Sequence, residues 1–404
     1  MDINALREKL DNSQYIYLYG AGLAGINYLQ RFTRQLPCRP IEGIVVSEKE
    51  GNPEKIGGGV SVVPLSELSA PKDASFFWIT AGAKYQKEII QRLEDAGHSR
   101  YAVPNQEIME KLYMLEKHEF TDRRRFLNKV LFVLAGYKEF LWGDVFERLE
   151  KYLSDDIEVC VLSSGLKSGR LAELAGKNGW SYLNTAYNSV TMIQNIAMEY
   201  YQNAEWFYKL DEDIFLTEGT LESMMKTFAR VQELEPCNVG VVAPLIPLNG
   251  YGYIRILDKL GLRERYEKKF DKVLSGGYPA KKIESDIDAA AFMWGVTGEI
   301  PKLDELNRLF AGSNEYSFCN VRFSIGCILY NREFWDKMGS AYPYGTGQPA
   351  DVGEDEVHLC ARTVLKSYVL AVDESSVVGH FSFGAQTEGM KDYYANRHEL
   401  FEIQ

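Results

Sequence analysis

Short apolar runs alternate along the chain with segments whose apolar residues recur at helical spacing. The run YIYLY at 15–19 is followed by Ile26, Leu29 and Phe32, which fall on one helical face. An amphipathic segment at 87–97 ends in glycine, a common helix stop. The strands expected in this first series cover 15–19, 41–47 and 75–80. Strands that alternate with helices are typical of α/β proteins with a mostly parallel, doubly wound sheet.

A second series of the same kind begins at residue 129. Its expected strands are 129–138, 157–165, 181–185, 206–210 and 239–246, and its expected helices are 144–153, 170–180, 190–204 and 354–365. The two series predict two doubly wound α/β domains. The expected boundaries are 1–120 for a Rossmann-like domain, 121–128 for a linker and 129–404 for the second domain. A charged segment at 250–285 is an expected insertion, either a lid, an acceptor-binding element or a solvated helix.

Composition limits the function classes. The chain has 404 residues, 46% of them hydrophobic, and a formal net charge of −12. Nucleic-acid binding normally needs a basic surface, so no nucleic-acid partner is expected. The six cysteines form no CxxC pair, which predicts reduced thiols in a cytoplasmic protein. No apolar run approaches the roughly 20 residues of a membrane span, and the polar first residues are not those of a signal peptide.

A glycine-rich turn follows the first apolar run. Gly20, Gly22 and Gly25 have the spacing G-x-G-x-x-G between the expected strand and the expected helix. Such a turn lets backbone N–H groups approach a phosphate, so the three glycines are candidate contacts of a nucleotide. The alternative is that they only permit close strand–helix packing. The segment from 14 to about 105 resembles the small Rossmann-like modules attached to bacterial polysaccharide-biosynthesis enzymes, which implies nucleotide or nucleotide-sugar binding.

An acidic triplet, Asp211, Glu212 and Asp213, follows the expected strand WFYKL. Ligands of doubly wound sheets bind at the carboxyl ends of the strands, and buried carboxylates there need water or a cation to neutralise them. Asp211 and Asp213 can reach one Mg²⁺ or Mn²⁺, an ion that completes its coordination shell with substrate phosphates and water. The alternative is an acidic turn that caps the next helix.

A second acidic pair stands near the C-terminus. Glu354 and Asp355 open an expected helix, where the helix dipole favours a carboxylate. His380 follows after an expected strand. The order of acidic triplet, Gly-Glu-Asp helix start and strand-end histidine resembles the A-type (GT-A) fold of family 2 glycosyltransferases. The resemblance covers residues 129 to about 385.

The resemblance includes further positions and two departures. Gln194 and Asn195 stand where the family has an Arg-Asn pair, and the strand at 239–246 matches the strand after the triplet. The second expected strand ends in Ser163-Ser164, where the family has two aspartates, the first of which contacts the nucleotide base. Base recognition is therefore expected to differ from that of the family.

The resemblance implies a role for each candidate residue. Asp355 would be the catalytic base that deprotonates the acceptor hydroxyl. Asp211, Asp213 and His380 would hold Mn²⁺ or Mg²⁺ against the donor diphosphate. The donor would contact Leu134, Ala135, Ser163, Asn195, Asp211 and Glu212, and the acceptor side would include Glu354. Independently of the resemblance, Trp294 in the segment WGV at 294–296 and the segment AYPYGTG at 341–347 are candidate acceptor walls, because sugars stack on aromatic faces; the alternative for each is core packing.

The implied function is metal-dependent, inverting transfer of a sugar from a nucleotide-diphosphate donor to a glycan or glycolipid acceptor, in bacterial surface polysaccharide synthesis. Two alternatives stay open. The Rossmann-like domain could be the active part of a nucleotide-sugar oxidoreductase whose C-terminal domain binds substrate, or the chain could be a degenerate transferase that acts as a scaffold. A cytoplasmic location is expected, with peripheral attachment to the inner face of the membrane and homo-oligomer formation left open.

Overall fold

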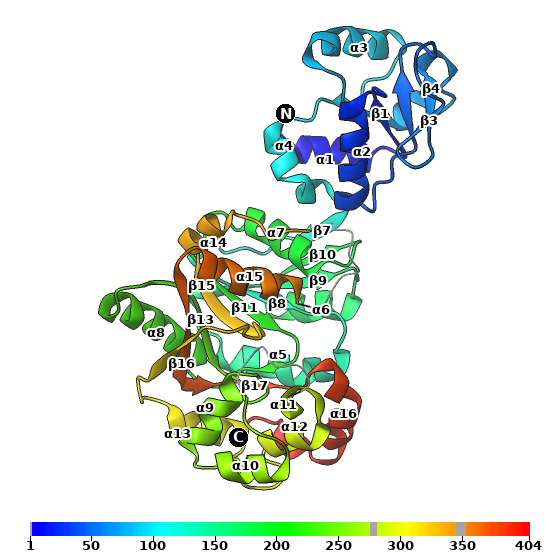
Figure 1. The fold of residues 1–404 in the computed structure, drawn as a ribbon. Coiled ribbons are helices and arrows are strands. Elements are labelled where there is room, and N and C mark those ends of the chain that lie inside the picture. The colour runs from blue at the N-terminus through cyan, green and yellow to red at the C-terminus, as the bar shows by residue number, and fades with distance from the viewer. Residues whose placement is uncertain (1, 275–280, 345–352) are drawn as a thin grey trace.

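The computed structural model describes residues 2–274, 281–344 and 353–404. In these ranges the chain is a mixed α/β protein with a six-stranded sheet, a nine-stranded sheet and a two-stranded ladder. Figure 1 shows the smaller sheet with its helices as an upper lobe and the larger sheet with the remaining helices as a lower lobe. The α/β class expected from the sequence is confirmed.

The six-stranded sheet has the order β3-β4-β2-β1-β5-β6. Its strands are β1 Tyr15–Tyr19, β2 Gly43–Val46, β3 Lys55–Ile56, β4 Val60–Pro64, β5 Ser75–Ile79 and β6 Tyr101–Ala102. Its helices are α1 Ile3–Asp11, α2 Leu23–Gln35, α3 Ala83–Asp95 and α4 Gln106–Glu110. β1 lies between β2 and β5 and runs parallel to both, so the strand order reverses there. The glycine turn follows β1 at this reversal.

The nine-stranded sheet has the order β14-β16-β13-β15-β11-β8-β9-β10-β7. Its strands are β7 His118–Thr121, β8 Lys129–Leu134, β9 Ile157–Ser164, β10 Ser181–Thr185, β11 Trp206–Asp211, β13 Asn238–Leu245, β14 Tyr316–Cys319, β15 Cys327–Asn331 and β16 Tyr368–Val377. β10, β9, β8 and β11 form a parallel group, and β13 and β16 form a parallel pair. β7, β14 and β15 run antiparallel to their neighbours.

The larger sheet is more mixed than the mostly parallel arrangement expected from the sequence. β15 separates the two parallel groups, and its first residue, Cys327, pairs with Leu210 near the carboxyl end of β11. After β13 the chain first forms the edge strand β14 and then enters β15 beside the carboxyl end of β11, so β15 runs in the opposite direction. Parallel neighbours need a crossover that returns the chain to the other edge.

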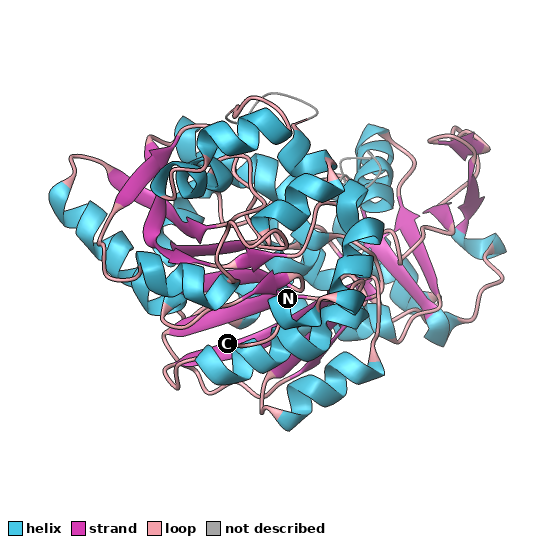
Figure 2. Ribbon diagram, turned by 90° about the horizontal axis from the view of Figure 1, so that it is seen from below, coloured by secondary structure: helices cyan, strands magenta, loops and turns pink. Residues whose placement is uncertain are grey.

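Helices cover both faces of the larger sheet (Figure 2). The helices of this lobe are α5 Trp142–Tyr152, α6 Gly169–Lys177, α7 Val190–Tyr200, α8 Thr220–Leu234, α9 Gly252–Lys259, α10 Arg263–Lys269, α11 Lys282–Ser285, α12 Ile287–Met293, α13 Leu303–Phe310, α14 Arg332–Met338, α15 Glu354–Leu365 and α16 Thr387–Asn396. The elements expected from the hydrophobic pattern are present, with ends shifted by a few residues. α7 is buried from Thr191 to Met198, because it packs against the sheet, α15 and the short 3-10 helix η3, Leu112–Leu115.

The two lobes are joined through η3, Leu112–Leu115, which packs on α1 and on α7. Glu199 of α7 accepts a hydrogen bond from the Tyr113 hydroxyl at 2.9 Å and pairs with Lys111 at 2.7 Å. Packing and polar contacts therefore hold the N-terminal lobe against α7, the helix that also packs on β9 and β10 of the larger sheet.

The expected linker does not hang free between the lobes. β7 pairs antiparallel with β10, so the larger sheet begins before the boundary expected after residue 120. Arg123 donates to a backbone carbonyl of Trp180 at 2.9 Å, and Arg125 donates to that of Ile157 at 2.7 Å. These bonds fasten the segment to the amino-terminal edge of the larger sheet.

The six cysteines are free thiols, and Cys160, Cys319 and Cys327 are buried. Within the three described ranges, no helix has the length and apolar character that crossing a membrane requires.

Candidate functional site

The carboxyl ends of β8 and β11 lie side by side, and Leu134 pairs there with Asp211. The strand order reverses between these two strands. After β8 the chain adds β9 and β10 on one side of β8, and the next strand, β11, lies on the opposite side of β8. Open α/β sheets bind ligands in the crevice outside such a reversal. The acidic triplet therefore lies where a ligand of this sheet is expected.

Glu212, the middle residue of the triplet, is part of the fold. Its carboxylate accepts hydrogen bonds from the backbone N–H groups of Gly136 and Tyr137, at 2.8 and 2.9 Å, and from the indole of Trp142 at 2.7 Å. It is buried, with 8% of the residue exposed. The donor contact expected for Glu212 is therefore not what its side chain offers here, because its oxygens brace the loop after β8.

Asp211 meets a buried ammonium. Lys209 lies two residues earlier and so points to the same face of β11. Its Nζ is 2.8 Å from Oδ1 of Asp211 and donates to the backbone carbonyl of Ile325 at 3.0 Å. The Lys209 side chain is only 3% exposed, so the ammonium is fixed by these partners rather than by water.

Asp355 reaches the same ammonium from another element. It lies in the first turn of α15, and its Oδ2 is 3.7 Å from Lys209 Nζ. The same oxygen accepts a hydrogen bond from Nε2 of Gln194 at 3.1 Å, while Oδ1 accepts one from the backbone N–H of Glu356 at 2.9 Å. The structure thus brings Asp211 and Asp355 together on either side of Lys209.

Asp213 forms a second cluster with His380. A short antiparallel ladder between β12, Ile214–Phe215, and β17, Gly379–His380, pairs His380 with Ile214, the residue directly after Asp213. Nε2 of His380 lies 3.3 Å from Oδ2 of Asp213, and Nδ1 lies 3.1 Å from the carbonyl of Leu248. If Nδ1 donates to that carbonyl, Nε2 directs a lone pair toward Asp213, which is the orientation of metal-binding histidines. Lys138 contacts the same oxygen, Oδ2.

The charges of these groups follow from their neighbours. Burial raises the pKa of Asp211 to about 6, the nearby carboxylates add to the rise, and Lys209 opposes it. Burial also acts to raise the pKa of Asp213, but its contacts with His380 and Lys138 outweigh burial and hold this pKa well below its usual value. Burial acts to lower the pKa of Lys209, but its carboxylate partners outweigh burial and raise it. Asp213 is accordingly a carboxylate at neutral pH and Lys209 an ammonium.

The donor set fits a divalent ion in part. Across residues 2–274, 281–344 and 353–404, no three His, Cys, Asp or Glu side chains are arranged to hold a metal ion together. Asp213 and His380, 3.3 Å apart, do fit neighbouring positions on one ion, because two ligands about 2.1 Å from an octahedral centre lie about 3 Å apart. Asp211, the third ligand implied by the resemblance, is held by Lys209 instead.

Other residues expected to touch the donor are committed to the fold. The hydroxyl of Ser163 donates to the carbonyl of Leu166 at 2.8 Å. The amide of Asn195 makes two bonds to the backbone of Tyr342, at 2.7 and 2.9 Å. The backbone N–H of Ala135 donates to a carbonyl of β9 at 2.9 Å. The polar groups of these three residues named here are therefore engaged within the chain.

The two residues expected on the acceptor side are Trp294, which is buried, and Glu354, which is the first residue of α15. Trp294 is 5% exposed, and its indole donates to the carbonyls of His380 and Phe381 at 3.1 and 3.2 Å. A side chain this buried cannot form the wall of an acceptor site in this conformation. Its two hydrogen bonds instead hold the backbone at His380 in place. Glu354 begins α15 directly before Asp355.

The three glycines of the N-terminal turn, Gly20, Gly22 and Gly25, differ in what a side chain at each position would meet. Gly20 has φ +121°, a conformation that side chains rarely adopt. A Cβ on Gly25 would lie 2.0 Å from the carbonyl oxygen of Gly20, so Gly25 is required for close packing. A Cβ on Gly22 would meet no described atom within 4 Å, and Gly22 is the N-cap of α2 without a side-chain cap bond. No described atom therefore covers the side-chain position of residue 22 at the start of α2.

Valine substitutions at Gly22 and Gly25 are expected to act differently. Gly22→Val should leave the unfolding temperature nearly unchanged, because its φ of −77° suits any residue, but should abolish nucleotide binding at this turn by filling the phosphate approach. Gly25→Val should destabilise the lobe by about 2 kcal/mol or more through overpacking. Calorimetric titration with UDP, GDP and NAD⁺, beside thermal unfolding, measures both effects. Unchanged nucleotide binding by Gly22→Val would leave the turn with a packing role alone.

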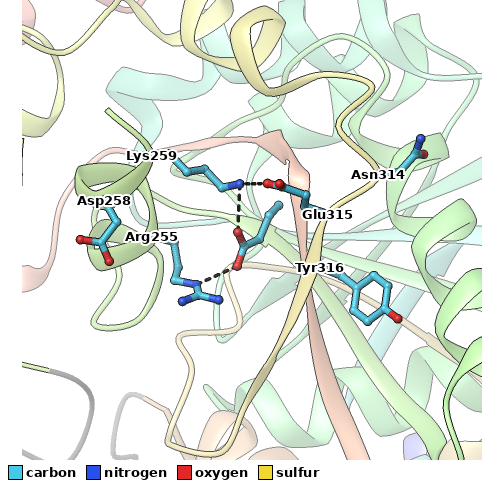
Figure 3. Close-up of a pocket in the computed structure, with 7 residues that line it drawn as sticks. Arg255, Asp258, Lys259, Asn314, Glu315 and Tyr316 are labelled. Atoms are coloured by element: carbon cyan, nitrogen blue, oxygen red, sulfur yellow. Dashed lines mark hydrogen bonds and ion pairs between the residues drawn. The ribbon is translucent and has the colours of Figure 1, made fainter. Parts of the chain in front are cut away.

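A cavity of about 470 Å³ is lined in part by the charged segment expected at 250–285, and none of the expected catalytic, metal or donor residues lines it. Figure 3 shows Arg255 and Lys259 of α9 on one side of it and Glu315 on the other. Arg255 and Lys259 pair with Glu374 at 2.7 and 3.1 Å, and Lys259 also contacts Glu315. These ion pairs tie the charged insertion to β16, and both lysine and arginine are neutralised within the chain.

Sequence reasoning missed the two lysines of the site. Lys209 could have been found from the alternation of side chains along β11, since positions 209 and 211 share a face. Lys138 had no comparable signal, because its contact with Asp213 depends on the path of the loop after β8. The partner of Asp355, Gln194, stands at a position that the sequence did single out.

No protein-family model and no curated protein sequence matches the chain. Among solved structures, it is similar to the mannosyltransferase PcManGT from Pyrobaculum calidifontis in complex with GDP-Man and Mn²⁺, with 13% identity, a TM-score of 0.37, and coverage of 67% of this chain and 62% of that one. The chain therefore spans less than two thirds of that mannosyltransferase.

Two further solved structures are similar over a comparable length. One is CMP:2-keto-3-deoxy-manno-octonic acid synthetase complexed with CTP, with 11% identity, a TM-score of 0.35, and coverage of 67% of this chain and 99% of that one. The other is glucosyl-3-phosphoglycerate synthase from Mycobacterium tuberculosis in complex with Mn²⁺, UDP and phosphoglyceric acid, with 13% identity, a TM-score of 0.33, and coverage of 69% and 80%. Likenesses of this size assign no activity to this chain.

Proposed function

We propose that this chain is a metal-dependent, inverting glycosyltransferase with a GT-A fold that takes its sugar from a nucleotide-diphosphate donor. The observation that carries the proposal is the arrangement at the carboxyl ends of β8 and β11. There Asp213 meets His380 at 3.3 Å, and Lys209 lies between Asp211 and Asp355. One cluster suits a divalent ion, and the other supplies a carboxylate for proton transfer.

The proposed chemistry is a single displacement. Asp355 takes the proton of the acceptor hydroxyl as that oxygen forms a bond to the anomeric carbon. The bond from the anomeric carbon to the diphosphate breaks, and the diphosphate leaves with the bonding electrons, so the configuration inverts. A divalent ion bound at Asp213 and His380 would offset the charge on the leaving group. Lys209 holds Asp211 in place, and Gln194 orients Asp355.

The N-terminal lobe is proposed to be a separate Rossmann-like domain that binds a nucleotide or nucleotide sugar. The open approach at Gly22 supports this binding. It also supports, as a second candidate, a nucleotide-dependent activity located in this lobe, with the larger lobe binding substrate. The acceptor is proposed to be a glycan or glycolipid of a bacterial surface polysaccharide, and the reaction is proposed to take place in the cytoplasm.

A thermal-shift screen of UDP-, GDP- and dTDP-sugars, each with Mn²⁺ and with EDTA, tests the proposal. A ligand at 100 times its dissociation constant stabilises the native state by about 2.7 kcal/mol, which is expected to raise the unfolding temperature by a few degrees with one donor class and only with Mn²⁺. The Gly22→Val variant should give the same metal-dependent shift. A shift that disappears in Gly22→Val and persists in EDTA would favour the second candidate instead.

A further inference from the structure

The carboxylate of Asp213 already has a cation. Its Oδ2 contacts both Nζ of Lys138 and Nε2 of His380, the latter at 3.3 Å. Asp213 is 5% exposed, whereas the Lys138 side chain is 27% exposed. The ammonium therefore reaches a buried oxygen from the open side of the site.

Lys138 stands on a backbone that is held in place. The two residues before it, Gly136 and Tyr137, donate their N–H groups to Glu212, and the Tyr137 hydroxyl donates to the carbonyl of Ser164 at 2.7 Å. The lysine side chain is the part of this loop that can move without breaking those bonds. Its flexible four-carbon stem lets the ammonium change partner while the backbone stays where it is.

The two cations cannot use this oxygen together. A metal ion held by Oδ2 and by Nε2 of His380 would share this oxygen with the ammonium of Lys138, and the like charges would repel each other. The local charges agree with an exchange. Three carboxylates, Asp211, Asp213 and Asp355, face two ammonium groups, Lys209 and Lys138, so these five side chains together carry a charge of −1. A divalent ion would make the cluster positive unless an anion came with it.

We propose that Lys138 is a counter-cation of Asp213: its ammonium competes with the divalent ion for the Asp213 carboxylate, and it binds the donor's diphosphate once the ion has displaced it. This inference rests on the proposed function. Metal and nucleoside diphosphate then bind in a coupled way: the ion displaces the ammonium, and the displaced ammonium has an anionic partner only when the diphosphate is present. A lysine in this place keeps the site neutralised between turnovers and favours loading of metal and donor together.

The test is the variant Lys138→Gln, titrated by calorimetry first with Mn²⁺ alone and then, at saturating Mn²⁺, with UDP and GDP. Loss of the competing ammonium should tighten Mn²⁺ binding by about tenfold, which corresponds to roughly 1.4 kcal/mol. Loss of the diphosphate contact should weaken the nucleoside diphosphate by a similar factor. Lys138→Arg keeps the charge and should stay close to the wild type in the Mn²⁺ titration.

Lys177→Gln is the matched control, because Lys177 forms an exposed ion pair with Glu150 at 3.3 Å, away from the site. Neither affinity should change in it. Effects of opposite sign in Lys138→Gln support the inference, since damage to the fold would weaken both ligands. An unchanged or weaker Mn²⁺ affinity overturns it, as does the absence of Mn²⁺ binding in both proteins. If the wild type binds Mn²⁺ but no nucleoside diphosphate, the proposed function fails, and the Mn²⁺ titration still decides whether Lys138 competes for Asp213.

Discussion

Asp355→Asn is expected to lower sugar transfer to the acceptor by about 10²- to 10⁴-fold, the usual effect of removing a general base, while the dissociation constant of the donor stays within a few-fold. The asparagine keeps the shape of the side chain but cannot take the acceptor proton. The groups proposed to hold the donor's diphosphate, Asp213, His380 and Lys138, lie in the other cluster and are unchanged. Calorimetry measures donor binding, and single-turnover kinetics measures transfer.

The surroundings of Asp355 set the limits of this test. Both of its oxygens accept hydrogen bonds, from Gln194 Nε2 and from the backbone N–H of Glu356, and asparagine can satisfy only one of them. A loss of about 1 kcal/mol in stability is therefore expected and is measured by thermal unfolding.

Glu356→Gln is a control on the same helical turn, because the carboxylate of Glu356 pairs with Arg322 and acts on Lys209 and Asp355 only through its charge, while the backbone N–H that donates to Asp355 is unchanged. It should transfer sugar at close to the wild-type rate. If Asp355→Asn also transfers at that rate, Asp355 only starts a helix, and Glu354 becomes the next candidate for the base.

Much of the fold could be predicted from the hydrophobic pattern. The runs at 15–19 and 129–134 are strands because they are apolar and rich in aromatic and β-branched residues, which suits a strand buried on both faces. The direction of β15 could not be predicted. It depends on the path of the chain between β14 and β15, and the residues of β15 carry no signal for that path.

The candidate site could be located from the sequence but not built. The pattern placed Asp211 at the end of β11, and the structure agrees. The side-chain directions of Glu212 and Asp213 could not be predicted from the sequence, because β11 ends at Asp211 and the alternation of side chains ends with it. Glu212 turns inward to donors on the loop after β8, and Asp213 turns toward β17. These partners are distant in sequence, so only the fold could distinguish a bracing carboxylate from a ligand-binding one.

Asp213→Ala is expected to abolish metal-dependent donor binding and turnover, because it removes the carboxylate that faces His380. EDTA should cause the same loss in the wild type and no further loss in the variant, which is the signature of one shared site. Lys138 should be freed toward solvent, and His380 should keep its bond to Leu248, so only a modest fall in stability, about 1 to 3 kcal/mol, is expected. Donor calorimetry with and without EDTA, beside thermal unfolding, measures each effect.

Asp156→Ala provides the control for this loss, since Asp156 also forms an ion pair with a lysine, Lys129, at 2.5 Å, but directly before β9 at the opposite edge of the sheet. It removes the same charge and should leave metal and donor affinities unchanged. The comparison separates a local ligand from the general effect of a less acidic protein, because both variants change the net charge equally. Full activity of Asp213→Ala, or of the wild type in EDTA, would remove the metal from the mechanism. The charge on the leaving diphosphate would then have to be balanced by the ammonium groups of Lys138 and Lys209 alone.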